Sequence, residues 1–452
     1  MNTKVHAKLA QVPGARAIVK GFRNLRERIF MPLRQTTNEH EAMLKILADT
    51  NFQMRAIMKH AQNKPINVLF VCHEPALWNM FESIYEVMEN DSAFCPMVVA
   101  LPYRHPTLPN GQYKDAGMYE YCQSQNIKAI QGLNKETNDW LNPASLLPDY
   151  VFFQTPYPLL IPAWSVEQIA MMARICYVPY GSSVAKGKIA TNVHPEGFFR
   201  YVSLFFTENQ MKRELLEKRF EEKNWFEKEN IIVSGYPKFD YLNEIKNYSG
   251  KAWKRGTRKD IKRILWTPRY LTTEGTCHFF DYKNYFVEFC KNQPDVDFVF
   301  RPHPLCFQNF IKTGEMNLDE QNKMKYEYHI SPNMAIDETE SYEDTFMTSD
   351  ILISDYSSLI IEYFATGKPI IYTHRKNEFN EYALALSAGM YWVQSIKELD
   401  ETILMLLSGM DPLSKKRKEL INRYFFMPEG GAGLAIKEYL HADYRKCLST
   451  NE

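Results

Sequence analysis

Short runs of apolar residues recur along most of the chain and alternate with amphipathic stretches. In the first half the apolar runs are Asn67–Cys72, Met97–Leu101, Tyr150–Phe153, Ile175–Val178, Val202–Phe206 and Ile231–Val233. In the second half they are Ile264–Trp266, Phe298–Phe300, Ile351–Ile353, Ile370–Tyr372 and Tyr391–Val393. Helical patterns lie between several of them, for example at Leu77–Met88, Trp164–Ala173 and Gln210–Arg219. Strands that alternate with helices predict largely parallel sheets covered on both faces.

The alternation is interrupted at the lysine-rich polar stretch Asn247–Lys262, which has little periodicity and predicts a linker. The pattern of residues 413–445 is helical again, and we expect this segment to cross back and brace the first half. The predicted fold class is α/β, in two similar halves. The predicted domains are a helical N-terminal segment, two α/β domains and a C-terminal helix, at residues 1–64, 65–246, 260–430 and 431–452.

Composition narrows the class of protein. A chain of 452 residues is too long for one small core. Its 45% hydrophobic, 24% charged and 14% aromatic residues indicate a globular protein rather than a disordered one. The formal net charge of zero gives no general electrostatic reason to expect nucleic acid as a partner. The eight cysteines are scattered without a CxxC pair, and no apolar run reaches the ~18 residues of a membrane-spanning helix.

The N-terminal segment is strongly basic. Residues 1–36 hold eight Lys or Arg residues against one acid, Glu27. Within it, Ile18, Phe22, Leu25 and Ile29 fall on one face of a helix. This pattern predicts either an interfacial helix held on an anionic membrane surface or a helix packed on the protein's own body with a solvated basic face.

The segment Asp350–Thr373 reads as strand, polar turn, helix, turn and strand. Ser357 and Ser358 fall where that helix would begin, and Asp355 stands just before them. A helix N-terminus offers unpaired backbone N–H groups, which suit a phosphate, at the strand end where ligands bind in open α/β sheets. The alternative is ordinary helix capping, because Ser and Asp are favoured N-cap residues.

Two further turns of the second half follow predicted strands. Arg301-Pro302-His303-Pro304 follows the strand Phe298–Phe300, and its prolines stiffen the turn that carries His303. Histidine donates to phosphate or acts as an acid or base, and arginine offers a forked donor. Arg269 follows the first strand of this half and is another candidate phosphate donor. The alternatives are a structural histidine and arginines in surface ion pairs.

The first half contributes weaker candidates. Tyr180-Gly181-Ser182 follows an apolar run, with Gly181 allowing close backbone approach, and His194 comes a few residues later. Lys238 lies in a glycine-bearing turn after another predicted strand, where it could face the cleft between the halves. Ordinary strand-to-helix turns explain both segments equally well. No Walker, dinucleotide-binding, HExxH or GxSxG motif is present, and we expect neither a metal nor a cofactor.

In their order and spacing these segments resemble the bacterial CDP-glycerol glycerophosphotransferase family, the teichoic-acid polymerases and primases. The resemblance covers roughly residues 150–430. The segments are Tyr180-Gly181-Ser182, Ser234-Gly235-Tyr236-Pro237-Lys238-Phe239-Asp240, Thr267-Pro268-Arg269, Arg301-Pro302-His303-Pro304, and Ser354-Asp355-Tyr356-Ser357-Ser358 with Gly367-Lys368-Pro369.

The resemblance implies a GT-B-type fold, in which two Rossmann-like domains face a cleft and the second holds most of the nucleotide. It implies that an acceptor hydroxyl attacks the phosphate next to the alcohol of a CDP-alcohol, and that CMP leaves. It also implies a lipid-linked or polymer acceptor and a cytoplasmic location, peripheral on the inner face of a bacterial membrane. By position, His303, Ser357 and Ser358 would hold the donor pyrophosphate, Arg301 and Arg269 would assist, and Asp355 would help to fix the site.

The chain departs from this family in its first half. The family usually has a His-Gly-Thr turn whose histidine is the favoured general base, and here Tyr180 stands in its place. Either Tyr180 positions the acceptor, or His194 supplies the base, or the activity differs. The family's Pro-Arg-Asn-Asp turn here reads Pro237-Lys238-Phe239-Asp240. A glycosyltransferase that uses a nucleotide sugar and an inactive membrane-bound assembly factor therefore stay open as alternatives.

Overall fold

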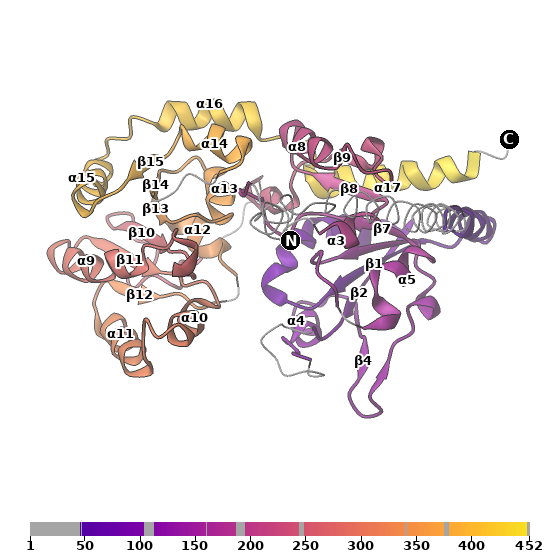
Figure 1. Ribbon diagram of the computed structural model, residues 1–452, viewed down its shortest axis with the longest axis horizontal. Helices are drawn as coiled ribbons and strands as arrows, with labels where there is room; N and C mark the ends of the chain where they lie inside the picture. Colours follow the sequence, from indigo (N-terminus) through magenta and orange to yellow (C-terminus); the bar gives the residue numbers. More distant parts are fainter. Residues whose placement is uncertain are drawn as a thin grey trace, which may run out of the picture.

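The structure is a computed structural model that describes residue 46 and residues 48–103, 113–159, 161–186, 195–243, 248–339, 341–374 and 379–449. These residues form two α/β halves side by side, the first coloured indigo to magenta and the second red to orange in Figure 1. The predicted α/β class is confirmed. The basic segment 1–36 and His194 lie outside the described residues, so their predicted roles stay predictions.

The first half is built on a seven-stranded parallel sheet with the order β3-β2-β1-β6-β7-β8-β9. Its strands are β1 (Ile66–Cys72), β2 (Phe94–Ala100), β3 (Ala129–Gln131), β6 (Tyr150–Phe153), β7 (Arg174–Tyr177), β8 (Leu204–Thr207) and β9 (Ile231–Val233). A small antiparallel hairpin, β4 (Leu133–Asn134) with β5 (Asp139–Trp140), projects from this half.

The second half is built on a six-stranded parallel sheet with the order β12-β11-β10-β13-β14-β15. Its strands are β10 (Lys262–Thr267), β11 (Val296–Phe300), β12 (Met334–Ile336), β13 (Ile351–Ser354), β14 (Ile370–Thr373) and β15 (Tyr391–Val393). β3 and β12 were not recognised from the sequence, because their residues AIQ and MAI lack the β-branched and aromatic runs of the equally short strands β9 and β15.

Helices cover both sheets. In the first half they are α3 (Glu82–Glu89), α4 (Met118–Ser124), α5 (Val166–Ala170), α7 (Glu196–Phe199) and α8 (Gln210–Phe220). In the second half they are α9 (Phe279–Asn292), α10 (Cys306–Lys312), α11 (Leu318–Ile330), α12 (Glu343–Thr348), α13 (Leu359–Phe364), α14 (Glu381–Ser387), α15 (Ile396–Leu407) and α16 (Ser414–Tyr424). Short 3₁₀ helices are η1 (Pro75–Met80), η2 (Pro143–Leu146), η3 (Pro162–Trp164), η4 (Lys228–Asn230), η5 (Pro237–Asn243) and η6 (Thr272–Glu274).

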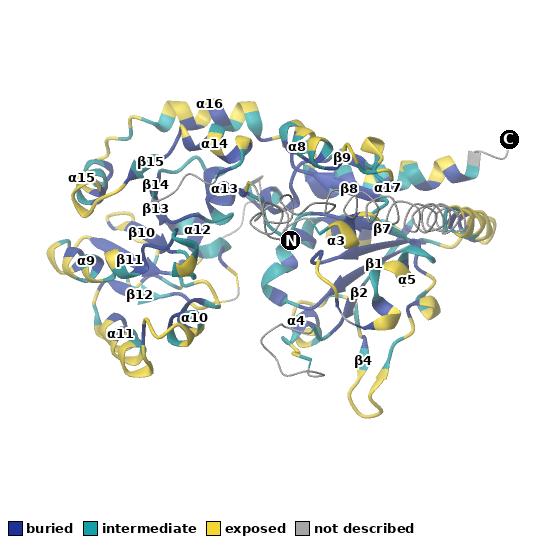
Figure 2. Cartoon of the chain, in the orientation of Figure 1, coloured by how far each residue is buried: buried dark blue, intermediate teal, exposed yellow. Residues whose placement is uncertain are grey.

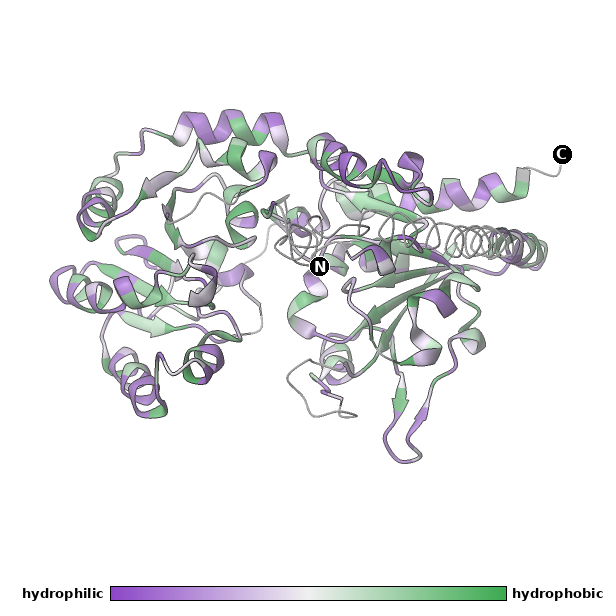
Figure 3. Cartoon of the chain, in the orientation of Figure 1, coloured by the Kyte–Doolittle hydropathy of each residue, from purple (hydrophilic) through white to green (hydrophobic). Residues whose placement is uncertain are grey.

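The strands form the cores, as the apolar runs predict. The central strands β6, β13 and β14 are buried at every residue. The sheets are accordingly dark blue in Figure 2 and largely green in Figure 3, while hydrophilic residues collect on outer helices such as α16. Parallel strands covered on both faces need such continuous apolar runs, and removing these side chains from water is the main favourable term in folding.

The C-terminal helix α17 (Gly431–Ser449) crosses back to the first half, as predicted, and packs against α3 and η5 (Figure 1). Its Ile436 and Leu440 are fully buried. Gly433 lies so close to α3 that a Cβ there would stand 2.6 Å from the backbone of Ser83. Asp240 of η5 accepts hydrogen bonds from the N–H groups of Ala432 and Gly433 at 2.8 and 2.9 Å, which satisfies donors at the start of the helix.

Residues 248–261 connect the halves without a helix or strand, at the place of the predicted linker. The segment is anchored, because Trp253 is 4% exposed and its Nε1 donates to Thr348 Oγ1 at 2.7 Å. Asp344 also accepts from the N–H groups of Gly250 and Lys251. Trp253 was not recognised as an anchor from the sequence, because lysines dominate the composition of this stretch. Within the described residues, no helix has the length and apolar character needed to cross a membrane.

The halves meet through backbone and side-chain contacts. Ala185 and Phe379 form an antiparallel bridge, and the Asn380 N–H donates to the Val184 carbonyl at 2.8 Å. The Asn380 side chain caps α14 through its oxygen and donates to the Ser183 carbonyl at 2.8 Å. The turn after β7 is therefore attached to the start of α14 in the other half.

Candidate active site between the two halves

Each sheet has one point where the strand order reverses, between β1 and β6 in the first half and between β10 and β13 in the second. Ligands of open α/β sheets bind outside the carboxyl ends of the strands at such points. The turn containing Arg269 follows β10, and the turn containing Asp355 follows β13. These two motifs of the sequence therefore flank the reversal point of the second sheet.

Asp355 supports this edge from inside. It is fully buried, and its Oδ2 accepts from the backbone N–H groups of Arg269 at 2.8 Å and His278 at 2.9 Å, while Oδ1 accepts from Thr373 Oγ1. A buried carboxylate that accepts two backbone N–H groups fixes the loop carrying them. Asp355 thus holds neighbouring turns in place, which agrees with the expectation that it fixes the site.

The two serines take different positions. Ser357 Oγ accepts from the Leu359 N–H at 3.2 Å, so the capping alternative describes this residue at least in part. Ser358 occupies the N-cap position of α13 and makes no side-chain capping bond. Both are partly exposed. Their predicted phosphate-binding role stays a prediction, and in both residues the hydroxyl hydrogen is able to donate to a ligand.

His303 is held by a stacking contact and a hydrogen bond. Its ring stacks on Tyr270 with 4.0 Å between centroids, and its Nδ1 accepts from the Leu305 N–H at 3.1 Å. This bond assigns the proton of the neutral ring to Nε2. The protein mass around the ring, and secondly the Arg269 guanidinium, lower the pKa of His303 to about 4. At neutral pH the ring is therefore an uncharged Nε2–H donor.

Both arginines make local ion pairs. Arg301 NH1 lies 2.6 Å from Asp337 Oδ2, and its NH2 donates to the Thr339 carbonyl at 2.7 Å. Arg269 Nε donates to Glu274 at 2.7 Å, and its guanidinium lies 4.7 Å from the centroid of the Tyr270 ring. These contacts match the alternative of structural ion pairs, so the predicted phosphate-binding role of either arginine needs a partial exchange of partners.

In the first half, Tyr180 is a poor candidate for a base. Its hydroxyl lies 3.0 Å from that of Tyr157. Burial, followed by the influence of Tyr157, raises the pKa of Tyr180 well above its ordinary value of 10.0. A phenol with a raised pKa holds its proton at neutral pH. Tyr180 therefore suits a positioning role rather than proton abstraction.

Gly181 brings the turns of the two halves into contact. A Cβ built on Gly181 would lie 3.3 Å from Ser358 Oγ, so the glycine allows the first-half turn to approach the start of α13. The next residue, Ser182, is fully buried and donates to Glu208 Oε2 at 2.8 Å. Residues far apart in sequence thus form one site, with the predicted acceptor turn directly against the predicted donor turn.

Lys238 lies inside the contact between the halves rather than on an open surface. It is 3% exposed, and its Nζ lies 3.2 Å from Tyr342 Oη and 3.5 Å from Glu362 Oε1. Tyr342 also donates to Glu362. Lys238 thus reaches the second half, as expected, but it is enclosed there, and its predicted part in binding the acceptor stays a prediction. Burial raises the pKa of Glu208, whose neighbours include Lys212, Glu362 and Lys238.

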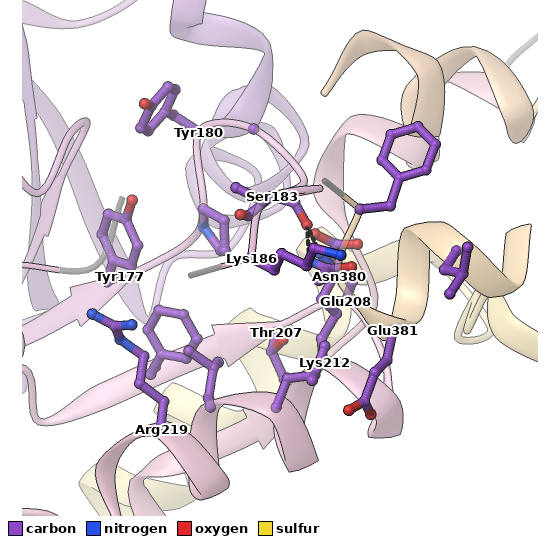
Figure 4. Close-up of a pocket in the computed structure, with 18 residues that line it drawn as sticks. Tyr177, Tyr180, Ser183, Lys186, Thr207, Glu208, Lys212, Arg219, Asn380 and Glu381 are labelled. Carbon is purple, nitrogen blue, oxygen red and sulfur yellow. Dashed lines mark hydrogen bonds between the residues drawn. The ribbon is translucent and has the colours of Figure 1, made fainter. Parts of the chain in front are cut away.

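A pocket of about 380 Å³ adjoins the Tyr180–Gly181 turn (Figure 4). Its apolar lining comes from both halves: Tyr177, Phe205, Leu215, Leu216, Phe379 and Leu384. Its charged lining is Lys186, Glu208, Lys212, Arg219 and Glu381. Figure 4 shows Ser183 and Asn380 joined by a hydrogen bond at the boundary between the halves. Among the described residues, no group of His, Cys, Asp and Glu is suited to hold a metal ion.

Sequence reasoning missed Tyr157, Glu208, Tyr342 and Glu362. Each depends on a partner distant in the sequence, so no local pattern marks them. Tyr270 was missed as well, although it directly follows Arg269 in the sequence. An aromatic residue next to a candidate phosphate-binding arginine was the signal that could have identified it.

Fold and site together define a two-domain α/β protein of the GT-B type, with its candidate active site where two sheet edges face each other. Residues 203–391 match the model of the CDP-glycerol:poly(glycerophosphate) glycerophosphotransferase family. This match covers less than half of the chain, and over these residues it confirms the resemblance seen in the sequence motifs.

Curated relatives are similar at low identity. The chain is 23% identical over 237 residues to the minor teichoic acid biosynthesis protein GgaB of Bacillus subtilis, covering 49% of this chain and 25% of that protein. It is 29% identical over 154 residues to the teichoic acid ribitol-phosphate polymerase TarK of Staphylococcus aureus, covering 32% of this chain and 27% of that one. The matches thus span only about a quarter of these relatives.

Solved structures share the fold. The wall teichoic acid polymerase TagF matches with a TM-score of 0.54 and 16% identity, over 95% of this chain and 99% of that chain. The UDP-GlcNAc 2-epimerase from Neisseria meningitidis bound to UDP-GlcNAc matches with a TM-score of 0.56 and 15% identity, over 84% of this chain and 100% of that chain. At such identities the likeness establishes the GT-B-type fold and nothing about the substrate.

Proposed function

We propose that this protein transfers an alcohol phosphate, glycerol phosphate or a similar group, from a CDP-alcohol to an acceptor hydroxyl and releases CMP. The acceptor is lipid-linked or polymeric, and the product is a teichoic-acid or capsule-like polymer of the cell surface. The family match over residues 203–391 and the teichoic acid names of the curated relatives support this class of reaction.

The observation that carries the proposal is the contact of Gly181 with Ser358. The 3.3 Å between a Cβ built on Gly181 and Ser358 Oγ leaves the donor and acceptor turns with no layer of protein between them. Transfer between two bound substrates needs the reacting atoms to be held within about 3–3.5 Å of each other. Two binding turns in direct contact satisfy this requirement, because each binds its substrate beside the other.

In the proposed reaction, the acceptor oxygen attacks the phosphorus next to the transferred alcohol. The bond from that phosphorus to the bridging oxygen breaks, and the bridging oxygen leaves on CMP with the electron pair. His303 donates a hydrogen bond from its Nε2–H to the donor pyrophosphate, and the hydroxyls of Ser357 and Ser358 donate beside it. Donors held in place in the free protein stabilise developing charge without first having to reorganise.

The proposed location is cytoplasmic and peripheral on the inner face of a bacterial membrane. The basic amphipathic segment 1–36 would hold the protein on anionic lipid, with each basic residue near the surface worth about 1 kcal/mol. Removing residues 1–36 should release the protein from anionic liposomes. Unchanged pelleting of the truncated protein would remove this part of the proposal.

The decisive assay measures nucleotide release from CDP-glycerol, CDP-ribitol and UDP-sugars in the presence of a polymer acceptor. Release of CMP from a CDP-alcohol supports the proposal, and release of UDP from a nucleotide sugar replaces it with a glycosyltransferase. The His303→Ala and Ser357→Ala variants should lose most turnover while staying folded. His329→Ala, an exposed histidine in the same half, is the matched control and should keep wild-type turnover.

The raised pKa of Tyr180 favours one alternative, an inactive assembly factor, because the family's histidine is missing at this position. That alternative predicts no turnover with any nucleotide and no measurable nucleotide binding by calorimetry. Binding of CDP-glycerol with turnover would exclude it.

A further inference from the structure

The sheet of the first half has its own point where the strand order reverses, and His73 lies at this point. Strands β1 and β6 are neighbours in the sheet although the chain visits β2 and β3 between them. His73 directly follows Cys72, the last residue of β1, and Gln154 directly follows Phe153, the last residue of β6. This is the position where open α/β sheets bind ligands. The proposed donor site lies at the reversal point of the second half, so the reversal point of the first half has no assigned role.

The loop at this point is rigidly held. The backbone N–H groups of His73 and Glu74 both donate to Gln154 Oε1 at 2.9 Å. In return, Gln154 Nε2 donates to the Glu74 carbonyl at 2.8 Å. The Tyr103 ring lies beside the imidazole with 5.0 Å between centroids. The histidine is therefore fixed in place by both strands of the reversal point and by the loop after β2.

The imidazole is buried without a full set of partners. His73 is 7% exposed, and its Nδ1 has no hydrogen-bond partner among the described residues. A buried polar atom left unpaired costs about 1–3 kcal/mol, a cost that usually has a functional reason. Burial alone lowers the pKa of His73 to about 4, with no resolved contribution from a neighbouring charge, although Glu74 adjoins it and Tyr103 faces it. The ring is therefore neutral at pH 7 and able to take up a proton.

The loop also lies where the halves meet. η1 begins at Pro75, and its Asn79 donates to Tyr342 Oη of the second half at 3.1 Å. Two other groups at this sheet edge are less suited to accept the proton of a bound acceptor. Tyr180 has a raised pKa and keeps its own proton, and the Glu208 carboxylate is 3% exposed and accepts from the buried Ser182. Of the two histidines in the described residues 48–243, the other, His60, is exposed on the helix of residues 48–61 that precedes β1.

We propose that His73 is the general base for the acceptor and replaces the family histidine that is missing at Tyr180. This inference rests on the proposed function. The acceptor O–H gives its proton to the His73 imidazole as its oxygen bonds to the phosphorus. The electron pair of the broken phosphorus–oxygen bond leaves on CMP, and His73 afterwards releases its proton to water.

The test compares the wild type, His73→Asn, His73→Ala and the exposed control His60→Ala in the full chain. CMP release is measured from pH 3 to 8.5, a range that spans the pKa of His73, with CDP-glycerol and acceptor, and CDP-glycerol binding is measured by calorimetry. A general base contributes about 10²–10⁴-fold, so kcat of both His73 variants should fall by that factor. Their affinity for CDP-glycerol should stay within about twofold, because the donor turns lie in the other half.

The pH profile separates a base from a merely structural residue. The decline of wild-type kcat/KM towards acid pH should be absent from the residual activity of His73→Asn. An active wild type whose His73→Asn variant keeps turnover within fivefold, or keeps the acid decline, overturns the inference. Failure of the proposed function looks different, because the wild type itself then releases no CMP. If His73→Ala does not fold, the asparagine variant, which keeps a polar side chain, decides the result.

Discussion

The strongest structural prediction concerns Asp355, whose carboxylate supports two turns of the candidate donor site. Replacing it with alanine removes the acceptor of the Arg269 and His278 N–H groups, which it binds at 2.8 and 2.9 Å. Each buried N–H left without a partner costs about 1–3 kcal/mol. We therefore expect Asp355→Ala to lower the free energy of unfolding by about 2–6 kcal/mol, a large part of the stability of a typical domain.

Asp355→Asn is the informative companion variant. An amide oxygen can still accept from both N–H groups, and its nitrogen then faces Thr373 Oγ1, which can rotate to accept. The loss is mainly that of the negative charge, so we expect a cost of about 1–2 kcal/mol. The order of stability should be wild type, then asparagine, then alanine.

The assay combines urea unfolding with hydrogen exchange at the Arg269 and His278 amides. A local loss of about 2 kcal/mol accelerates their exchange by roughly 30-fold. CDP-glycerol binding should weaken too, because Tyr270, on which His303 stacks, follows Arg269 directly. Asp319→Ala, an exposed residue of the same half, serves as the control. An alanine variant within 1 kcal/mol of the wild type, with unchanged exchange at both amides, would refute the reasoning.

Three further predictions concern the contact between the halves and the pH response. Lys238→Met leaves the buried Glu362 without its cation and should lower the free energy of unfolding by about 3–5 kcal/mol. Adding Glu362→Gln to this variant should restore part of the loss, and urea unfolding measures both changes. Gly181→Ala places a Cβ 3.3 Å from Ser358 Oγ and should reduce kcat of CMP release while changing the unfolding free energy by less than about 1 kcal/mol. The fold lowers the pKa of His303 from 6.5 to about 4. Between these pH values the unfolded chain binds more protons at this histidine than the folded chain does. Acidification from pH 6.5 to 4 therefore destabilises the fold. His303→Gln should therefore lose less stability than the wild type between pH 7 and 5.

Matched controls make these outcomes interpretable. Lys397→Met removes an exposed lysine from a surface pair and should change stability by less than about 0.5 kcal/mol. Gly197→Ala adds a Cβ that meets nothing within 4 Å, so turnover should stay at the wild-type value. Equal losses in a control and its test variant, or parallel pH curves for His303→Gln and the wild type, would contradict the corresponding prediction.

The strands and their terminal motifs were predictable, because a buried parallel strand needs a continuous apolar run and its ligand-binding turn follows in sequence. That local rule is enough to locate the turns at Tyr180, Arg269, His303 and Asp355 from the amino-acid sequence. It failed where a short strand lacks β-branched and aromatic residues in a run, as in β12, and where lysines outnumber the anchoring tryptophan, as around Trp253.

The sequence by itself therefore determined the α/β class, the two halves, the resemblance to a glycerophosphotransferase family and the edge of each sheet on which polar chemistry gathers. Tertiary structure alone decided that Gly181 meets Ser358, that Lys238 is buried against Glu362, and that His73 and Gln154 share the reversal point of the first sheet. The physical reason is that apolar periodicity is a property of neighbouring residues. Contacts between side chains far apart in the chain exist only once two sheets have packed and their edges face each other.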